Sequence, residues 1–240
     1  MGVPASSGSQ WRNGASRNMI KSVVFFKRKP GMSVEDFQAY WRERHAAVVA
    51  TLPGVRRYVQ SHTRPAIYRR REPVYDGIAE LWNDDLDALR AMTRHPHYQA
   101  VRADEANFID AATMGGLVAR EHVIKDGAAP PGAVKNVEFV TRRPDLTVEA
   151  FQRHWREVHG PIAAAIPVVR RYVQSHVLPE TYARRTPPYD GIAVTWFDST
   201  DAMRHSATTV EYVRTRADEP NFIAPGDVPV ILTTEHVIIG

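Results

Sequence analysis

The chain contains one module twice, at a fixed offset of 114 residues and without an insertion in either copy. The closest matches pair residues 41–45 with 155–159, 56–62 with 170–176, 75–79 with 189–193, and 121–124 with 235–238. Because the offset never changes, even the loops have kept their length, and each half should adopt the same fold. A period this long indicates a duplicated domain rather than a solenoid, whose repeats span about 20 to 50 residues.

The 240 residues suit two domains of about 110 residues each. We therefore expect a first module over 19–125, a linker over 126–133 and a second module over 134–240. Residues 1–18 are rich in Ser, Gly and Asn and lack the apolar core of a signal peptide. They are expected to be a flexible leader, a tag remnant or a misassigned start.

Composition excludes several classes of site and partner. The chain has no cysteine, which excludes disulfides, thiol nucleophiles and thiolate metal sites and favours a cytoplasmic location. No apolar run approaches the roughly 20 residues of a membrane span, so no membrane partner is expected. The net charge is +4, but the basic residues are mixed with 27 acidic ones and form no basic helix. Nucleic acid is therefore not an expected partner.

The first module has the pattern of a ferredoxin-like fold. Strands are predicted over about 21–27, 55–62, 75–82 and 117–124, and helices after Ser33, after Asp84 and from about 98 to 108. The first helix carries an apolar stripe that recurs in the second module: Phe37, Trp41, His45, Val48 and Leu52, then Phe151, Trp155, His159, Ile162 and Ile166. The order βαββαβ predicts a four-stranded antiparallel sheet with both helices on one face.

The strands are too apolar for the other face of that sheet to contact water. Side chains alternate along a strand, so Val23, Val24, Phe25 and Phe26 cannot all face the helices. The second module can cover the remaining face. We therefore predict an α+β fold in which two ferredoxin-like modules pack sheet to sheet as an intramolecular pseudo-dimeric α+β barrel. The chain would be a monomer with an internal pseudo-twofold axis, or a homodimer.

Five segments of each module resemble the EthD family of the dimeric α+β barrel superfamily. In the first module they are Phe37…Trp41…His45, residues 58–62, residues 75–77, the stretch 103–108 and Glu121-His122. The resemblance implies the barrel fold. It leaves the activity open, because the superfamily includes isomerases, dehydratases, decarboxylases, cofactor-free oxygenases and haem enzymes, and EthD proteins are tied to ether breakdown and polyketide tailoring.

Histidines on the helical stripe are the first candidates for catalysis. His45 and His159 point toward the core, where an imidazole needs a hydrogen-bond partner and can act as acid or base near neutral pH. The alternative is a buried histidine that fastens the helix to the sheet. Gly160-Pro161 directly follows His159, so the second helix is expected to break there and to aim His159 differently.

A second candidate pair joins two neighbouring strands. His62 ends one strand and Asp76 begins the next, and a hairpin would bring them together, with the aspartate raising the basicity of the histidine. His176 and Asp190 repeat the pair. The alternative is a polar latch that holds the loop. Period-two spacing places four further polar side chains on the faces of these histidines, where they can line a substrate pocket: Tyr58, Gln60, Tyr172 and Gln174.

Tryptophans and one carboxylate complete the predicted substrate site. The possible flat walls for an aromatic ligand are Trp41, Trp82, Trp155 and Trp196, although large aromatics can equally be plain core. Glu80 shares a face with Trp82, and its counterpart is Val194. If that is the helix face, this difference removes a carboxylate from the second site, and only one module would be competent.

Cofactors are not expected. His95-Pro96-His97 has no equivalent in the second module, and two histidines without a supporting carboxylate make a weak metal site. Haem is expected as little as a metal ion is. There is no Gly-rich phosphate loop or dinucleotide motif, which argues against ATP and NAD.

These observations favour a small-molecule enzyme without an organic cofactor. It would use histidine for proton transfer in a dehydration, isomerisation or decarboxylation of an aromatic, polyketide-like or xenobiotic-derived substrate. His62 with Asp76 would be the base, and His45 the acid or orienting group. One alternative is a cofactor-free oxidoreductase that uses dioxygen. Another is a protein that binds a hydrophobic metabolite, or assists another enzyme, without catalysis.

Overall fold

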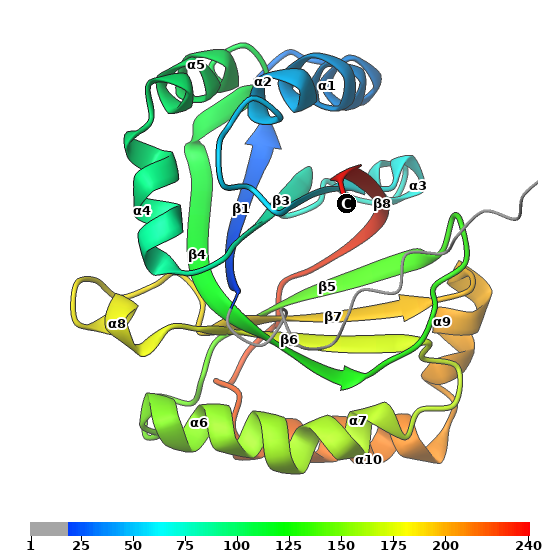
Figure 1. The fold of residues 1–240 in the computed structure, drawn as a ribbon. Coiled ribbons are helices and arrows are strands. Elements are labelled where there is room, and N and C mark those ends of the chain that lie inside the picture. Colours follow the sequence, from blue (N-terminus) through cyan, green and yellow to red (C-terminus); the bar gives the residue numbers. More distant parts are fainter. Residues whose placement is uncertain (1–18) are drawn as a thin grey trace, which may run out of the picture.

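A computed structural model describes residues 19–240 as one eight-stranded barrel with helices packed around it (Figure 1). The expectation for the leader 1–18 falls outside the described residues. Each module contributes four strands and covers its own part of the barrel wall with its own helices. Within 19–240, no helix combines the length and the apolar character needed to cross a membrane.

The first module follows the predicted order of elements, with one extra short helix. Its strands and helices are β1 (Ile20–Arg28), α1 (Val34–Tyr40), α2 (Ala46–Val49), β2 (Arg57–Thr63), α3 (Pro65–Tyr68), β3 (Gly77–Asn83), α4 (Leu86–Arg94), α5 (Pro96–Glu105) and β4 (Ile109–Lys125). Ser33 caps α1 as expected, because its hydroxyl accepts a hydrogen bond from the backbone N–H of Asp36.

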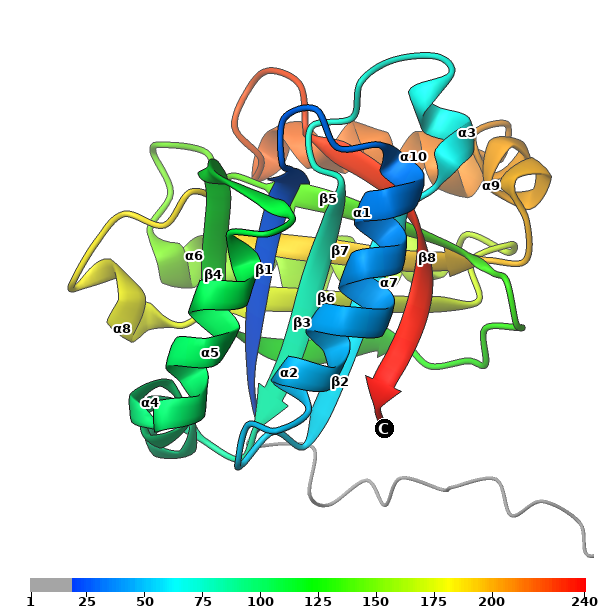
Figure 2. The same ribbon diagram turned by 90° about the horizontal axis from the view of Figure 1, so that it is seen from above.

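The second module repeats these elements. They are β5 (Val134–Val140), α6 (Val148–His154), α7 (Gly160–Ala164), β6 (Arg171–Val177), α8 (Pro179–Tyr182), β7 (Gly191–Phe197), α9 (Thr200–Ser206), α10 (Val210–Asp218) and β8 (Val230–Ile239). Figure 2 shows α1, α2, α4 and α5 on one side of the barrel, with α6, α7, α9 and α10 on the other. The predicted fold class is confirmed.

The barrel closes because the last strand of each module also pairs with the other module. The strand order is β1-β3-β2-β8-β5-β7-β6-β4. Strand β4 pairs with β1 and with β6, and β8 pairs with β5 and with β2, all antiparallel. The two sheets are therefore joined by backbone hydrogen bonds as well as by packed side chains, and no free edge remains.

Alternation along the strands divides the buried side chains into three groups. One group fills the barrel, including Val23, Phe25 and Ile78 with their counterparts from the second module. At one end of this interior, the hydroxyls of Tyr75 and Tyr189 meet at 2.9 Å across the pseudo-twofold axis. The other two groups lie between sheet and helices, one in each module. These two helix–sheet spaces are the places where a chamber was expected.

Strand β4 begins earlier than the sequence pattern suggests. The predicted strand starts near Leu117, whereas β4 starts at Ile109. The sequence of residues 109–116 shows no alternation of apolar and polar side chains. This segment is a strand because its backbone pairs with β1. Gly115 permits this pairing, because a Cβ there would lie 2.1 Å from the ring of Phe25.

Candidate active site

The helix that carries His45 widens by one residue in the turn that ends at His45. Between α1 and α2, the segment Trp41–His45 is a π-helical turn, in which the N–H of Ala46 donates to the carbonyl of Trp41. That carbonyl accepts a second hydrogen bond, of 2.8 Å, from Nε2 of Gln60 on β2. Such turns are frequent at functional sites. Here the bond from strand to helix fixes the rotation of the helix and the direction of His45.

His45 is hydrogen-bonded to a carboxylate from α5. Its Nδ1 lies 2.7 Å from Oδ2 of Asp104. Burial lowers the pKa of His45 despite this partner, so the imidazole is neutral at pH 7. Because an ionised carboxylate can only accept, Nδ1 carries the hydrogen and Nε2 keeps its lone pair.

The carboxylate of Asp104 is held ionised by its other neighbours. Its Oδ1 accepts from the hydroxyl of Tyr40 at 2.7 Å and from Nδ2 of Asn107 at 3.1 Å. Burial alone would raise the pKa of Asp104, but the hydrogen bonds from Tyr40, His45 and Asn107 outweigh it and lower the pKa. Asp104 thus orients His45 and can stabilise its protonated form.

A cavity of about 520 Å³ lies beside His45, between the helices and the sheet of the first module. Its walls are mostly apolar, with contributions from Val24, Phe26, Ala79, Leu81, Val49, Leu52, Leu89 and Met92. Within residues 19–240, Nε2 of His45 has no hydrogen-bond partner. Because His45 lines the cavity, a small molecule bound there would contact the imidazole.

Tyr58 also lines this cavity. Its oxygen accepts from Nε1 of Trp41 at 3.2 Å and from Nε2 of Gln60 at 2.9 Å. Burial raises the pKa of Tyr58, so the phenol stays protonated. With its lone pairs engaged, the remaining capacity of the hydroxyl is to donate its own hydrogen to a ligand.

A second carboxyl group, Glu105, also lines the cavity. Its side chain is 15% exposed and forms an ion pair with Arg102. Burial raises the pKa of Glu105 to about 7, and Arg102 offsets this only in part. A carboxyl group that is half protonated near neutral pH can both give and take a proton.

The predicted pairing of His62 with Asp76 is wrong. His62 lies opposite Gly77 in the β2–β3 ladder, so Asp76 is one residue out of register and its side chain turns toward β1. Its Oδ2 accepts from the backbone N–H of Arg28 at 2.6 Å, and its Oδ1 from the guanidinium of Arg28 at 2.7 Å and from Tyr68. Asp76 thus holds the loop in place, as the latch alternative describes.

His62 is placed among aromatic side chains. Its Nε2 lies 3.0 Å from Oε1 of Gln60, and its ring stacks on Trp41 at 4.2 Å between centroids. Burial, with the nearby His236 and Arg42, lowers the pKa of His62 to about 2. Its Nε2 is engaged by Gln60, and His62 is not among the residues that line the cavity beside His45, so the geometry does not support His62 as the base.

The second module repeats the histidine–carboxylate pair of the first. Nδ1 of His159 lies 3.1 Å from Oδ2 of Asp218, and burial lowers the pKa of His159 to about 4. The expected break at Gly160-Pro161 is wrong, because α7 begins at Gly160 and continues the helix. Pro161 lies in the first turn of α7, directly after a π-helical turn, where a missing N–H is tolerated.

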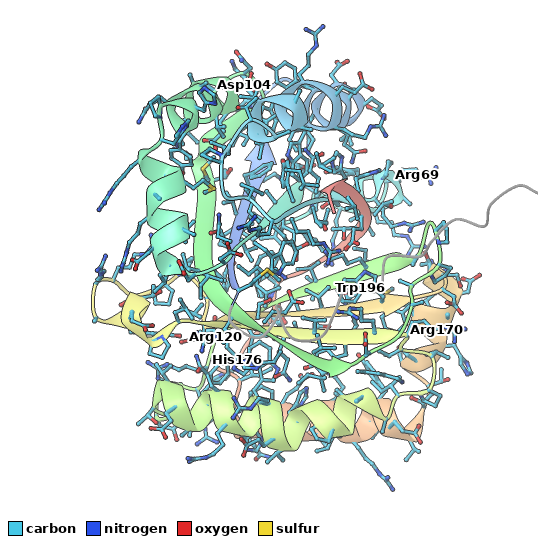
Figure 3. All side chains as sticks on the ribbon, in the orientation of Figure 1. Arg69, Asp104, Arg120, Arg170, His176 and Trp196 are labelled. Carbon is cyan, nitrogen blue, oxygen red and sulfur yellow. The ribbon has the colours of Figure 1, made fainter. Side chains whose placement is uncertain are left out.

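The other second-module candidates also repeat the arrangement of the first. His176 lies 2.9 Å from Oε1 of Gln174, stacks on Trp155 and points from β6 toward α6 (Figure 3). The hydroxyl of Tyr172 accepts from Trp155 and Gln174. Asp190 accepts from Arg142 and from Tyr182, not from His176. The predicted pairing of His176 with Asp190 is therefore also wrong.

The tryptophans separate into two groups. Trp41 lines the cavity, and both Trp41 and Trp155 lie in the helix–sheet spaces. Trp82 and Trp196 instead lie at the barrel interior, where Lys21 sits 4.8 Å from the centre of Trp82 and Lys135 sits 5.2 Å from the centre of Trp196. Trp82 and Trp196 therefore do not wall the cavity beside His45.

Glu80 also faces the barrel interior, which corrects the expectation for this residue. It bridges two buried lysines from different modules, with Lys21 at 2.7 Å and Lys135 in a short contact. Burial alone would raise the pKa of Glu80, but Lys135 and Lys21 lower it to about 2. The change to Val194 in the second module thus removes no carboxylate from the helix–sheet space.

The two helix–sheet spaces differ in the floor that the sheet provides. In the first module the floor includes Ser22, Val24 and Leu81. The second module has Asn136, Glu138 and Thr195 at these positions. Nδ2 of Asn136 donates to Oε1 of Glu138 at 2.8 Å and reaches Oγ1 of Thr195 at 3.4 Å. Burial raises the pKa of Glu138.

Sequence reasoning missed Asp104 and Glu105 as candidate site residues. Asp104 is 59 residues from His45, and no local periodicity links them. A signal was present in the duplication, because His159 and Asp218 keep the same separation and the same residue types. No three His, Cys, Asp or Glu side chains of residues 19–240 converge as a potential metal site.

Comparison with known families agrees with this architecture. The model of the EthD domain matches residues 29–112 and 143–226, which together span well over half of the chain. The chain belongs to the EthD family. It carries two EthD domains in tandem, each of which covers most of one module. No curated protein matches the chain.

Solved structures share this fold at low sequence identity. A candidate monooxygenase from Fusobacterium nucleatum aligns with a TM-score of 0.62 and 9% identity, over 92% of this chain and 94% of its own. An anthrone oxidase-like protein aligns with a TM-score of 0.62 and 11% identity over the same shares. A candidate monooxygenase from Lactobacillus acidophilus aligns with a TM-score of 0.58 and 12% identity, over 92% and 95%. At these sequence identities the similarity concerns the fold alone.

Proposed function

We propose that this EthD protein catalyses proton transfer on a small, largely apolar substrate whose C–H bond is activated by a carbonyl group. The proposal rests on the hydrogen bonding and the neutral form of the His45 imidazole. Its Nδ1 is bonded to Asp104, its Nε2 has no hydrogen-bond partner within residues 19–240, and the residue lines the cavity. A neutral imidazole oriented by an ionised carboxylate is a general base near neutral pH.

The cavity supplies the other groups that such a step requires. Nε2 of His45 takes the proton from the carbon, and the electron pair moves onto the carbonyl oxygen. Tyr58 donates its free hydrogen to that developing oxyanion. Glu105 is the second titratable group of the cavity, placed to return or relay a proton. The apolar walls exclude water and hold a flat ring system. No organic cofactor is part of this proposal.

Proton return to another carbon completes an isomerisation, and loss of a leaving group completes a dehydration. The same deprotonated substrate is also electron-rich, and dioxygen can oxidise it without a cofactor. The structural neighbours described as monooxygenases and as anthrone oxidase-like favour this oxidation as the second candidate. Both candidates share the first step, so both require His45.

Anthrone is a suitable probe because its methylene hydrogens are acidified by the conjugated carbonyl. Under nitrogen in D₂O, we expect the protein to accelerate hydrogen–deuterium exchange at this methylene, followed by NMR. His45→Gln should slow the catalysed exchange by about 100-fold or more. Asp104→Asn should slow it by about tenfold, because the imidazole loses its orienting acceptor.

The matched control is His159→Gln, which changes the equivalent dyad of the second module and should leave exchange intact. Air is then admitted to follow oxygen uptake. If one dioxygen is consumed for each anthrone converted to anthraquinone and water, the oxidation is supported. Tight binding of anthrone without exchange or oxidation would contradict the enzyme proposal and favour a carrier of hydrophobic metabolites.

A further inference from the structure

The cavity beside His45 is not built by one module alone. Besides residues of the first module, it is lined by Leu178, Glu180, Thr181, Arg184 and Arg185. These belong to α8 and the turn around it, in the second module. Figure 1 shows α8 next to the end of α4 that lies away from α5. The cavity therefore runs from His45 and Glu105 at the α5 end to α8 at the other.

The α8 end of the cavity is positively charged. Arg184 and Arg185 from the second module and Arg90 from α4 line it, with Glu180 as the acidic residue there. Arg185 is anchored, because its guanidinium donates to the carbonyl of Gly116 on β4 at 3.2 Å. The guanidinium of Arg184 has no hydrogen-bond or ion-pair partner within residues 19–240, and Arg90 pairs with Asp87.

This charge contrasts with the remainder of the cavity, whose walls are mostly apolar. A neutral ligand would gain less from guanidinium groups at one end than an anion would. A ligand with an apolar ring system and an acidic group would place the rings against the walls and the acid between Arg184 and Arg185. Guanidinium groups present several N–H donors in a plane that matches the oxygens of a carboxylate or sulfonate.

We infer that the ligand of this cavity is an aromatic acid, and that the second module recognises its anionic group through Arg184 and Arg185. The inference rests on the proposed function for its site and adds the substrate class. It also gives the duplication a role. The first module supplies His45, Asp104 and Tyr58, while the second supplies residues that select the substrate.

Two fluorescent probes with the same rings test this charge selection directly. Anilinonaphthalene sulfonate carries one negative charge, and N-phenylnaphthylamine is its uncharged parent. We expect the protein to bind the sulfonate roughly tenfold more tightly than the parent. In the Arg184→Gln/Arg185→Gln variant, the sulfonate should lose roughly that factor while the affinity for the parent stays the same. Added salt should weaken only the sulfonate.

The matched control is Arg70→Gln/Arg71→Gln, which changes the equivalent arginines after α3, outside the lining of this cavity. It should leave the affinity for both probes unchanged. The Ser22→Asn/Val24→Glu variant changes the cavity floor and should weaken binding of both probes, which locates them. Equal affinity for the two probes in the wild type would overturn the inference. The same conclusion follows if the arginine variant keeps the preference, or if neither probe binds.

The readout separates this inference from the proposed catalysis. His45→Gln should retain the preference for the sulfonate, because His45 lies at the other end of the cavity. If anthrone exchange does not depend on His45 but the charge preference is present, the catalytic proposal alone is wrong. If exchange depends on His45 and the preference is absent, the substrate class alone is wrong.

Discussion

The two modules share a scaffold and differ where function and assembly demand it. Both have the π-helical turn, the glutamine bonded to the carbonyl of its tryptophan, and a histidine paired with a carboxylate from a later helix, α5 or α10. They differ in the floor of the helix–sheet space, which is polar in the second module, and at residue 80, where the second module has Val194. A duplicated domain can therefore keep its architecture in both copies while only one keeps a mostly apolar floor beside the histidine.

The difference at position 80 follows from its place near the pseudo-twofold axis. Both modules keep a lysine here, and the lysines meet one shared carboxylate: Lys21 lies 2.7 Å from Glu80, and Lys135 contacts its other oxygen. Glu121 and Glu235 provide one further partner each, at 3.2 and 2.9 Å. A single central carboxylate serves both modules, so the second module does not need one of its own. A homodimer of identical modules could not have this asymmetry.

Replacing Glu80 by the residue of the other module should cause the largest loss of stability. Glu80→Val leaves two lysines that are each at most 3% exposed without their shared partner. Breaking a buried ion pair from one side costs about 3–5 kcal/mol of unfolding free energy. Urea denaturation measures this loss. Glu80→Gln, which keeps the shape and part of the hydrogen bonding, should lose less. A loss of unfolding free energy below about 1 kcal/mol for Glu80→Val would show that the two lysines are hydrated in the variant.

Transferring the floor of the second module into the first should remove ligand binding. Ser22→Asn/Val24→Glu places an amide and a carboxyl group where the cavity now has a small hydroxyl side chain and a valine, and the pair can bond as Asn136 and Glu138 do at 2.8 Å. We expect the affinity for N-phenylnaphthylamine to fall by about 100-fold. Its apolar rings would then pack against an amide and a carboxyl group, which lose their contact with water without gaining a hydrogen bond. Fluorescence titration measures this affinity.

The reciprocal variant, Asn136→Ser/Glu138→Val, is the control for the floor transfer. It should leave the affinity of the first cavity unchanged, since the residues that line that cavity are not altered. If both double variants reduced the affinity equally, the probe would bind between the modules. The two floors would then not explain the difference between the copies.

The fold was predictable from the sequence because its signals are local or repeated. The helical stripe, the alternating strands and the constant offset of 114 residues each point to the same barrel. The site was less predictable. Asp76 lies one residue out of register with His62, and at a strand end one residue decides which way a side chain turns. Alternation also predicted correctly that Glu80 and Trp82 share a face, but with both faces buried it could not say which one.

Acid should destabilise the protein through its buried histidines, equally in the two modules. Burial lowers the pKa of His62 to about 2, and that of His176 well below its usual value. In the unfolded chain both titrate near pH 6.5. Below that pH the unfolded state takes up protons that the native state does not, so the unfolding free energy falls as pH decreases. His62→Gln should therefore reduce this pH dependence by about 1.4 kcal/mol per pH unit between about pH 6 and 4.

Denaturation curves at several pH values measure that slope, and His176→Gln is the matched variant. Glu105 and Glu219, whose pKa values burial raises to about 7, act in the opposite direction but are common to wild type and variants. A reduction in slope for only one of the two histidine variants would show that one imidazole can be protonated in the native state. The two stacked Trp–His pairs would then have the same geometry but different histidine pKa values.

The smallest expected difference concerns the caps of the first helices. The hydroxyl of Ser33 accepts from the N–H of Asp36 at 3.0 Å and also donates to its carboxylate at 2.8 Å. Thr147 accepts from the N–H of Ala150 at 3.1 Å, and an alanine cannot provide the second bond. Ser33→Ala and Thr147→Ala should each cost about 1 kcal/mol in thermal or chemical unfolding. The loss of unfolding free energy should be slightly larger for Ser33→Ala, and only slightly because the cap bonds are solvent-exposed. The reverse order would mean that the methyl group of Thr147 stabilises the second module more than the extra bond of Ser33 stabilises the first.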